Sequence, residues 1–268
     1  MRKIWWNGKF YPYQAIRAFV EDPAFLYGEG LFETIKVING GPCFLEEHWE
    51  RLSRSAVRLS IPLRFEKEEV KEAVKELIKR NSIREGILHF YLTPISLYLT
   101  VTPSLPYGDR KAFRAIISSF RRNEFSPLTR HKVMNFYENR LARREAEEKG
   151  YDEAILLNTR GEVAEGAYSN IFIIKDETLL TPPLESGVLP GIVRKKVLEI
   201  AEREGIKVKE VKLHLEDLKR SEEIFFTSSL AGVMPCREVE KFFKNNKFPL
   251  TLFLREKFLR EEKLSIPD

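Results

Sequence analysis

Cysteine and histidine are scarce in this chain of 268 residues. Its two cysteines, Cys43 and Cys236, are too few for a disulfide framework and are not spaced as metal ligands. The four histidines, at positions 48, 89, 131 and 214, are scattered and show no ligand spacing either. We therefore expect no metal site, and we expect catalysis to depend on Lys, Glu, Arg, Tyr or a cofactor.

Long apolar runs are also missing. The N-terminal segment MRKIWWNGKF lacks the apolar stretch of a signal peptide. The apolar run at 90–101 is interrupted by Thr93, Pro94 and Ser96 and is too short to span a bilayer. These absences predict a cytoplasmic protein without a membrane partner.

The excess of positive charge is small. Lys and Arg total 45 against 40 Asp and Glu, which gives a formal charge of +5, and the two signs are interleaved along the chain. A nucleic-acid-binding protein usually concentrates its basic residues on one face. We therefore expect no nucleic-acid partner, although a pI near 9.0 is compatible with an anionic small molecule.

Apolar periodicity predicts helices and strands in both halves of the chain. Asn7-Gly8 between apolar flanks indicates a hairpin over 3–11. The first half continues with a strand at 32–38, helices at 45–59 and around 70–77, and strands near 86–102 and 112–119. The second half has a helix at 136–149, strands at 153–158, 162–174, 206–213 and 223–228, and a helix that opens at Pro190-Gly191.

Two domains follow from this order of elements. The stretch 118–129 is polar and has no period, so we interpret its core as an interdomain connection. The expected division is a smaller N-terminal α/β domain at 1–119, a linker at 120–129 and a larger C-terminal domain at 130–268. Mixed helices and strands in both parts predict an α/β (α+β) fold.

Two segments have the chemistry of a phosphate site. In 187–194 the chain passes through Gly191 into a helix, and the first amides, those of Ile192 and Val193, have no intrahelical partner. Ordinary helix initiation by Pro and Gly explains the same pattern. The hydroxyls of Thr227-Ser228-Ser229, at the end of an apolar strand, could bind phosphate or cap a turn.

Three charged residues each allow two interpretations, a functional role or an ordinary structural or surface role. Arg51 lies in an amphipathic helix, where it either reaches inward to a phosphate or is a surface residue. Glu165, among small residues in a buried sheet, needs a cation, which a protonated pyridine nitrogen or a structural arginine would supply. Lys132 precedes an apolar segment that would favour the neutral, nucleophilic amine, yet most lysines face solvent.

Taken together and in order, these segments closely resemble the class IV pyridoxal-phosphate family, which includes branched-chain aminotransferases, D-amino-acid aminotransferases and aminodeoxychorismate lyases. The resemblance spans nearly the whole chain. It rests on Tyr27–Thr34, Glu47–Leu52, Lys132–Phe136, Asp152–Leu157, Glu165–Phe172, Leu189–Arg194 and Glu223–Leu230.

The resemblance implies the two-domain fold type IV of these enzymes, with the active site at the domain interface, and a homodimer. It implies that Lys132 holds pyridoxal 5'-phosphate as a Schiff base and later moves protons, and that Glu165 faces the pyridine nitrogen. Arg51, the amides of Ile192 and Val193, and Ser229 would hold the phosphate, while Leu189 would pack against the ring. Val193 replaces the Thr that the family often has. The family's tyrosine at the phenolic oxygen is matched only by Phe136 or Tyr137.

Within the family, the run 226–235 looks most like the lyase branch. The stretch 86–95 has His89 and Pro94 and lacks the arginine pattern that the transaminases use near the substrate carboxylate. The favoured expectation is therefore a lyase that converts 4-amino-4-deoxychorismate, an anionic substrate, to 4-aminobenzoate and pyruvate in folate biosynthesis. An amino-acid aminotransferase for branched-chain or D-amino acids is the alternative. A basic interaction module that has lost the cofactor is a third reading, supported only by the pI.

Overall fold

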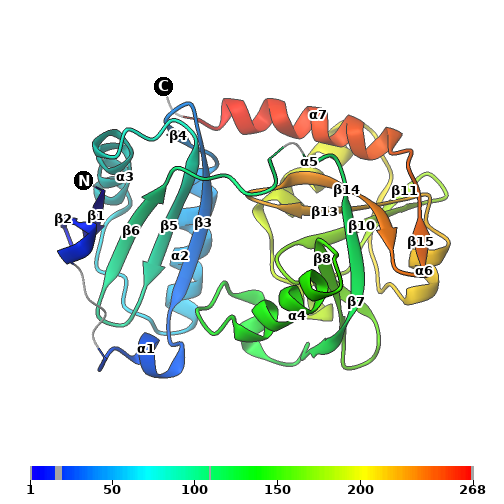
Figure 1. The fold of residues 1–268 in the computed structure, drawn as a ribbon, viewed down its shortest axis with the longest axis horizontal. Coiled ribbons are helices and arrows are strands. Elements are labelled where there is room, and N and C mark those ends of the chain that lie inside the picture. The colour runs from blue at the N-terminus through cyan, green and yellow to red at the C-terminus, as the bar shows by residue number, and fades with distance from the viewer. Residues whose placement is uncertain (1, 16–19, 109, 267–268) are drawn as a thin grey trace. The chain divides into compact units, whose positions relative to one another are not determined.

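The computed structural model describes residues 2–15, 20–108 and 110–266. The chain forms two compact units. Unit 1 contains residues 1–106, 132–136 and 261–268, and unit 2 contains residues 107–131 and 137–260. The course of the chain through each unit can be followed by colour in Figure 1.

This division differs from the expected one. The strand that begins at Phe113 runs on to Arg122 and pairs with two strands of unit 2, so residues 107–119 belong there. Residues 120–129 hold the end of that strand and the start of a 3₁₀ turn, and do not form a linker. The segment 132–136 belongs to unit 1 because its backbone bonds to the strand that begins at Leu31.

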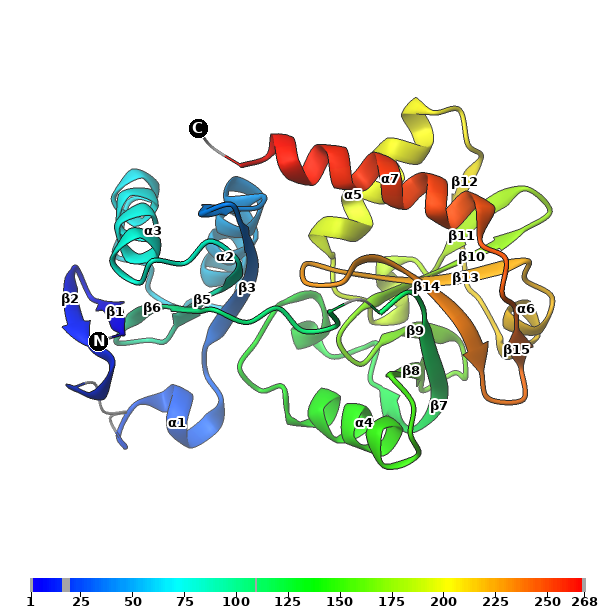
Figure 2. The same ribbon diagram turned by 45° about the horizontal axis from the view of Figure 1, so that its top comes forward.

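Unit 1 is a sheet covered on one face by helices. Within the described residues the sheet has six strands in the order β2-β1-β6-β5-β3-β4. The strands are β1 (Lys3–Trp6), β2 (Lys9–Pro12), β3 (Leu31–Ile38), β4 (Gly41–Pro42), β5 (Gly86–Leu92) and β6 (Leu97–Thr102). The helical segments are η1 (Tyr13–Ala15), α1 (Pro23–Tyr27), α2 (Leu45–Arg58) and α3 (Lys67–Arg80). Figure 2 shows α2 and α3 on the same face of this sheet.

Strict alternation along β3 and β5 produces this one-sided burial. Leu31, Glu33, Ile35 and Val37 point to the helices and are buried, while the residues between them are half-buried on the other face. The inward apolar side chains form one core with the apolar stripes of α2 and α3. Glu33 is the exception on this apolar face, and a buried carboxylate there needs a cationic partner.

Unit 2 contains a larger, strongly curved sheet. Its path is β12-β11-β10-β13-β14-β7-β8-β9, with β15 paired to β14. The strands are β7 (Phe113–Arg122), β8 (Glu153–Asn158), β9 (Val163–Gly166), β10 (Asn170–Lys175), β11 (Thr178–Thr181), β12 (Val208–Glu210), β13 (Glu223–Ser228), β14 (Gly232–Val239) and β15 (Phe243–Lys244). The helical segments are η2 (Pro127–Arg130), α4 (Tyr137–Glu148), η3 (Leu184–Ser186), α5 (Ile192–Arg203) and α6 (Leu215–Lys219). A last helix, α7 (Pro249–Leu264), ends the chain.

The curvature of this sheet brings β9 into contact with β10 as well as with β8. Helix α4 packs on β7 and β8, and α5 packs on β13 and β12. Glu165 on β9 and Asn170 on β10 therefore lie next to each other. This is where the polar residues of unit 2 gather.

Most expected elements are present near their expected bounds, including the hairpin at Asn7-Gly8, where both residues have positive φ. The strand expected at 162–174 is broken into β9 and β10, and the one at 206–213 shrinks to β12. Among the described residues, no helix is long and apolar enough to cross a membrane.

Candidate functional site

Lys132 is positioned by backbone pairing to the start of β3. The amide of Phe32 donates to the Lys132 carbonyl at 2.9 Å, and the amide of Met134 donates to the Gly30 carbonyl at 2.8 Å. Leu31 and Val133 form an antiparallel bridge between these bonds. The short segment 132–136 thus continues the unit 1 sheet, and its register fixes the point from which the lysine side chain leaves the backbone.

Two glycines make this pairing sterically feasible. A Cβ on Gly30 would lie 2.6 Å from the Met134 sulfur and 2.9 Å from the Leu92 carbonyl oxygen. Gly28 has φ +71°, and a Cβ there would lie 3.2 Å from the backbone of Asn135. The two glycines of Tyr27-Gly28-Glu29-Gly30 therefore allow the segment 132–136 to approach closely.

The Lys132 amine lies over aromatic rings. Its Nζ is 4.4 Å from the ring centroid of Phe32 and 5.6 Å from that of Phe136, and these two rings meet edge to face. Aromatic faces attract an ammonium group, whereas loss of water favours the neutral amine. Lys132 is half-buried, so both effects act on it. Lys132 is thus not fully solvent-facing, and its role toward a cofactor stays a prediction.

His89 and Tyr91 stand on the same sheet face as Phe32. Register pairs Phe32 with Tyr91 and Thr34 with His89, and the His89 and Tyr91 rings stack 5.5 Å apart. Burial, with the charges of Lys132 and Arg2, lowers the pKa of His89 to about 4. His89 is therefore a neutral neighbour of Lys132 at pH 7.

Replacement of His89 by glutamine should flatten the pH dependence of folding stability. The folded pKa lies below the unfolded value near 6.5, so the wild-type stability contribution of neutral His89 is present above pH 6.5 and is lost as the pH falls to about 4. We expect wild type to lose about 2 kcal/mol more folding stability than H89Q across this window. The figure is smaller than the full pKa shift would give, because the ring is only partly buried. Urea titrations at pH 7 and pH 4 measure the difference. Exposed His214 is the control, and an H214Q variant that flattens the slope equally would contradict the assignment.

Arg51 lies in the interior and is not the surface arginine that the sequence also allowed. Its Nε donates to Glu33 Oε1 at 2.8 Å and its Nη2 to Glu33 Oε2 at 2.6 Å, while His48 Nδ1 lies 2.7 Å from the same Oε2. The residues are nearly fully buried. The Arg51 and His48 charges hold the pKa of Glu33 at about 2, in spite of the desolvation by burial that would raise it. Glu33 thus orients the guanidinium whose role toward a phosphate stays a prediction.

Glu165 is the centre of a buried polar cluster in unit 2. Arg122 Nη2 donates to its Oε1 at 2.7 Å, and the Leu189 amide and Asn170 Nδ2 donate to its Oε2 at 3.0 and 3.3 Å. The sequence allowed two cationic partners for Glu165, a protonated pyridine nitrogen or a structural arginine. The structure contains the arginine. Arg122 is itself held by the Gly187 carbonyl and by Asn139. These donors hold the Glu165 carboxylate in place.

The segment before α5 is built for close approach. A Cβ on Gly191 would lie 2.0 Å from Asn170 Oδ1, so only glycine fits between that amide and the helix. Asn170 Nδ2 also donates to the Leu189 carbonyl at 2.9 Å. Gly191 is the N-cap of α5 and provides no side-chain cap for the amides of the first turn. Ile192 and Val193, which carry two of these amides, are buried in the helix-sheet contact.

The end of β13 contributes hydroxyl groups beside this cluster. Thr227 pairs with Asn170 across the sheet and is 1 % exposed, yet its Oγ1 has no hydrogen-bond partner within the described residues. Such an orphaned hydroxyl is costly unless a ligand satisfies it. Ser229 follows one residue beyond the strand and is half-buried. A helix start without a side-chain cap, an orphaned hydroxyl and a carboxylate suit the phosphate and the pyridine nitrogen of pyridoxal phosphate, so these residues fit that cofactor.

The two candidates for the family's tyrosine are placed differently. Phe136 packs edge to face against Phe32 and cannot offer a hydroxyl. Tyr137 is the first residue of α4 and is 61 % exposed. Of the two, only Tyr137 has a hydroxyl, and its role toward the cofactor stays a prediction.

Sequence reasoning gave no role to four residues that hold the site together. Glu33 could have been found, because it breaks an otherwise apolar face of a predicted strand. His48 could then have been predicted as a second partner of Glu33, because it lies one helical turn before Arg51. Arg122 and Asn139 carried no such signal, because the Arg122–Glu165 and Arg122–Asn139 contacts join residues far apart in sequence.

The chain is similar to known proteins over most of its length. The amino-transferase class IV family model matches residues 30–239. The chain belongs to this family. It is 35% identical to a Methanocaldococcus jannaschii protein named "Putative branched-chain-amino-acid aminotransferase". The match covers 96% of this chain and 95% of that protein.

Solved structures show the same class IV fold. A branched-chain aminotransferase from Thermoproteus uzoniensis has a TM-score of 0.90 and 31% identity, covering 97% of this chain and 94% of its own. A "Putative 4-amino-4-deoxychorismate lyase" from Legionella pneumophila has a TM-score of 0.87 and 28% identity, covering 92% and 96%.

This class IV chain has the fold type IV expected from its motifs. It is a pyridoxal-phosphate enzyme, a transaminase or a lyase, with small amino or keto acids as substrates. The comparisons favour the aminotransferase alternative over the lyase that the sequence placed first.

Proposed function

We propose that this class IV enzyme is a branched-chain amino-acid aminotransferase. The observation that carries the proposal is the end-to-end likeness to branched-chain aminotransferases in both sequence and fold. The aromatic rings of Phe32 and Phe136 beside Lys132 support it, because they offer an apolar surface to an aliphatic substrate side chain.

The proposed roles are those that the resemblance to class IV enzymes implies for these residues, and the contacts described above support them. When bound, pyridoxal phosphate supplies an electron sink for negative charge at the substrate α-carbon. Lys132 binds the cofactor covalently and moves the α-proton, and the Glu165 carboxylate holds a proton at the pyridine nitrogen. The amides of Ile192 and Val193, Ser229 and the Glu33-oriented Arg51 bind the phosphate. Leu189 packs against the ring. We further propose that the enzyme is a homodimer.

Substrate turnover tests the proposal. Holoenzyme is incubated with 2-oxoglutarate and L-leucine or D-alanine, and separately with 4-amino-4-deoxychorismate. We expect glutamate from L-leucine, with kcat/KM at least about 100-fold above that for D-alanine. Preference for D-alanine would replace the branched-chain assignment by the D-amino-acid one.

The lyase remains the second candidate because one specific observation favours it. Residues 86–95 contain no arginine, and His89 and Tyr91 face the Lys132 side of the sheet instead. Release of pyruvate and 4-aminobenzoate from 4-amino-4-deoxychorismate, without transfer of an amino group from L-leucine, would establish it and reject the aminotransferase.

Glu165→Gln should lower activity by on the order of 10²-fold, because a neutral amide cannot keep the pyridine nitrogen protonated. Glu153→Gln is the matched control, since Glu153 is a buried carboxylate of the neighbouring strand β8. We expect E153Q to affect stability while leaving kcat within about threefold. Steady-state rates and the cofactor absorption spectrum of both variants provide the measurement. Equal rates in E165Q and wild type would remove Glu165 from the mechanism.

A further inference from the structure

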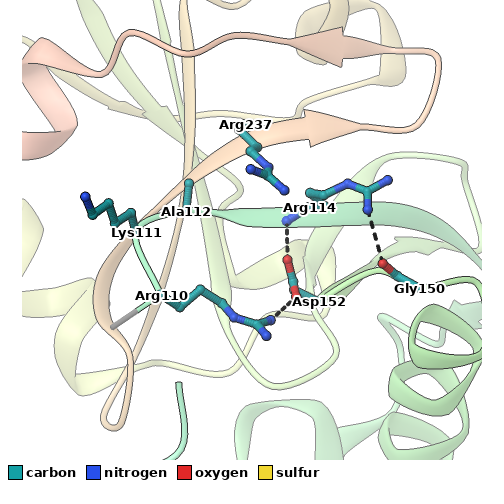
Figure 3. A pocket seen from close by; sticks show the side chains of 7 residues that line it. All are labelled: Arg110, Lys111, Ala112, Arg114, Gly150, Asp152 and Arg237. Carbon is teal, nitrogen blue, oxygen red and sulfur yellow. Dashed lines mark hydrogen bonds and ion pairs between the residues drawn. The ribbon is translucent and has the colours of Figure 1, made fainter. Parts of the chain in front are cut away.

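A basic hollow in unit 2 stands apart from the residues assigned to the cofactor. It has a volume of about 310 Å³, and Figure 3 shows the side chains around it. The residues that line it are Arg110, Lys111, Ala112, Arg114, Gly150, Asp152 and Arg237. We call these seven residues the basic hollow.

Three neighbouring strands build the basic hollow. Residues 110–114 lead into β7, Gly150 and Asp152 precede β8, and Arg237 lies on β14, which pairs with β7 on its other side. The β14–β7 register shifts between Cys236 and Glu238, a bulge irregularity that includes Arg237. Bulges re-aim side chains, and Arg237 is exposed while both of its neighbours in sequence are at least partly covered.

Four of the seven lining residues are cations and one, Asp152, is a carboxylate. Arg110 pairs with Asp152, whose other oxygen accepts the Arg114 amide at 2.7 Å. Arg114 Nε pairs with Glu238 at 3.0 Å, and its Nη1 donates to the Gly150 carbonyl at 3.3 Å. The carboxylates thus compensate Arg110 and Arg114 and hold them in place.

Lys111 and Arg237 differ from Arg110 and Arg114 in their contacts with the described residues. Neither makes a side-chain hydrogen bond or ion pair with any residue in the part of the chain that the structure describes. Two uncompensated positive charges around one hollow repel each other, and an anion with two negative charges would relieve this repulsion. Figure 3 shows the Arg237 guanidinium directed toward Arg114, whereas the Lys111 side chain extends away from the other cations.

We propose that the basic hollow binds the phosphate group of a small phosphorylated molecule. A guanidinium fork matches phosphate oxygens, and a lysine adds a point charge. The volume lies at the lower end of small-ligand pockets, which suits one or two phosphate groups. A nucleic-acid strand requires a track of basic residues across a surface, whereas this chain interleaves its charges. The proposal does not depend on which reaction the enzyme catalyses.

Calorimetric titration of the holoenzyme tests this site. The cofactor is kept bound so that its own phosphate-binding residues are occupied, and the buffer contains no phosphate. Inorganic phosphate, pyrophosphate and adenosine monophosphate are titrated separately, which distinguishes a free phosphate from an organic one. We expect saturable 1:1 binding of at least one of them.

Variants assign the binding to the basic hollow. Arg237→Gln should weaken binding at least about tenfold, and Lys111→Gln about threefold, because each removes one uncompensated charge. Arg220→Gln is the matched control, an exposed arginine of the same unit, and should change Kd by less than about twofold. Thermal unfolding verifies that all three variants are folded.

Three outcomes overturn the proposal. One is the absence of saturable binding up to about 10 mM, which is weaker than a specific site would give. Another is binding that R237Q leaves unchanged. The third is tighter binding of a single-stranded RNA oligonucleotide than of any of the three small phosphates, which would make the hollow part of a polymer-binding surface.

Discussion

Lys132→Ala should reduce turnover by on the order of 10⁴-fold or more, because the variant loses both the covalent attachment of the cofactor and the group that moves the α-proton. The Lys132 side chain leaves a backbone segment that is fixed to the start of β3 by two hydrogen bonds, and its amine lies over two rings. Steady-state kinetics with the substrate pair that wild type accepts provides the measurement.

Chemical trapping separates attachment from proton transfer. Borohydride reduction of wild-type holoenzyme should leave a phosphopyridoxyl group on the peptide that contains Lys132, and K132A should show none there. Added small amines should restore part of the K132A rate, since they replace the missing base. Lys9→Ala, at an exposed lysine of the same unit, should behave as wild type. A modified peptide elsewhere in the chain would refute the role of Lys132.

Glu33→Gln should cost about 3–5 kcal/mol of folding stability, because it leaves the buried Arg51 guanidinium without its counter-ion. Urea denaturation at pH 7 measures this loss. Exposed Glu46, which pairs with Lys67 and Lys71, is the control, and Glu46→Gln should cost less than about 1 kcal/mol. A loss in E33Q as small as that in E46Q would mean that the buried pair contributes little.

The pH dependence of E33Q gives a second readout. The folded pKa of Glu33 is about 2, below its ordinary value of 4.5, so its contribution is present above pH 4.5 and is lost as the pH falls toward 2. Wild type should therefore lose stability over this window faster than E33Q does. Replacing the pair together, as Glu33→Gln with Arg51→Met, should recover part of the loss at pH 7 because no buried charge remains unpaired. If Arg51 also binds phosphate, the double variant should bind the cofactor more weakly even when it is folded.

Local features of the chain were predictable from its sequence. The hairpin at Asn7-Gly8 follows from residues that tolerate positive φ, and β3 and α2 follow from apolar spacing. The functional reading of Lys132, Glu165 and the α5 segment came from their order along the chain. Each element here is specified by neighbours within a few residues.

Elements that depend on distant partners were missed. Strand β14 contains Pro235, which argues against a strand, yet it pairs with β13 from Gly232 to Cys236. Helix α7 has apolar residues on more than one side, such as Leu252, Phe253 and Leu254, so no clear stripe marks it. The Arg122–Glu165 pair joins a presumed linker to a distant strand, and only the folded sheet brings them together.

The polypeptide enters or leaves unit 1 at four peptide bonds, near residues 106, 131, 136 and 260. A fragment that stops at 106 would lose the five-residue lysine segment that extends β3. It would also lose Glu262, the buried partner of Lys36, and Ser265, whose hydroxyl accepts the Phe44 amide. Neither unit is thus a contiguous module that recombination could exchange with one crossover. A chimaera between relatives would need four matched junctions. Lys132 would lie in the shortest of the exchanged segments, residues 132–136.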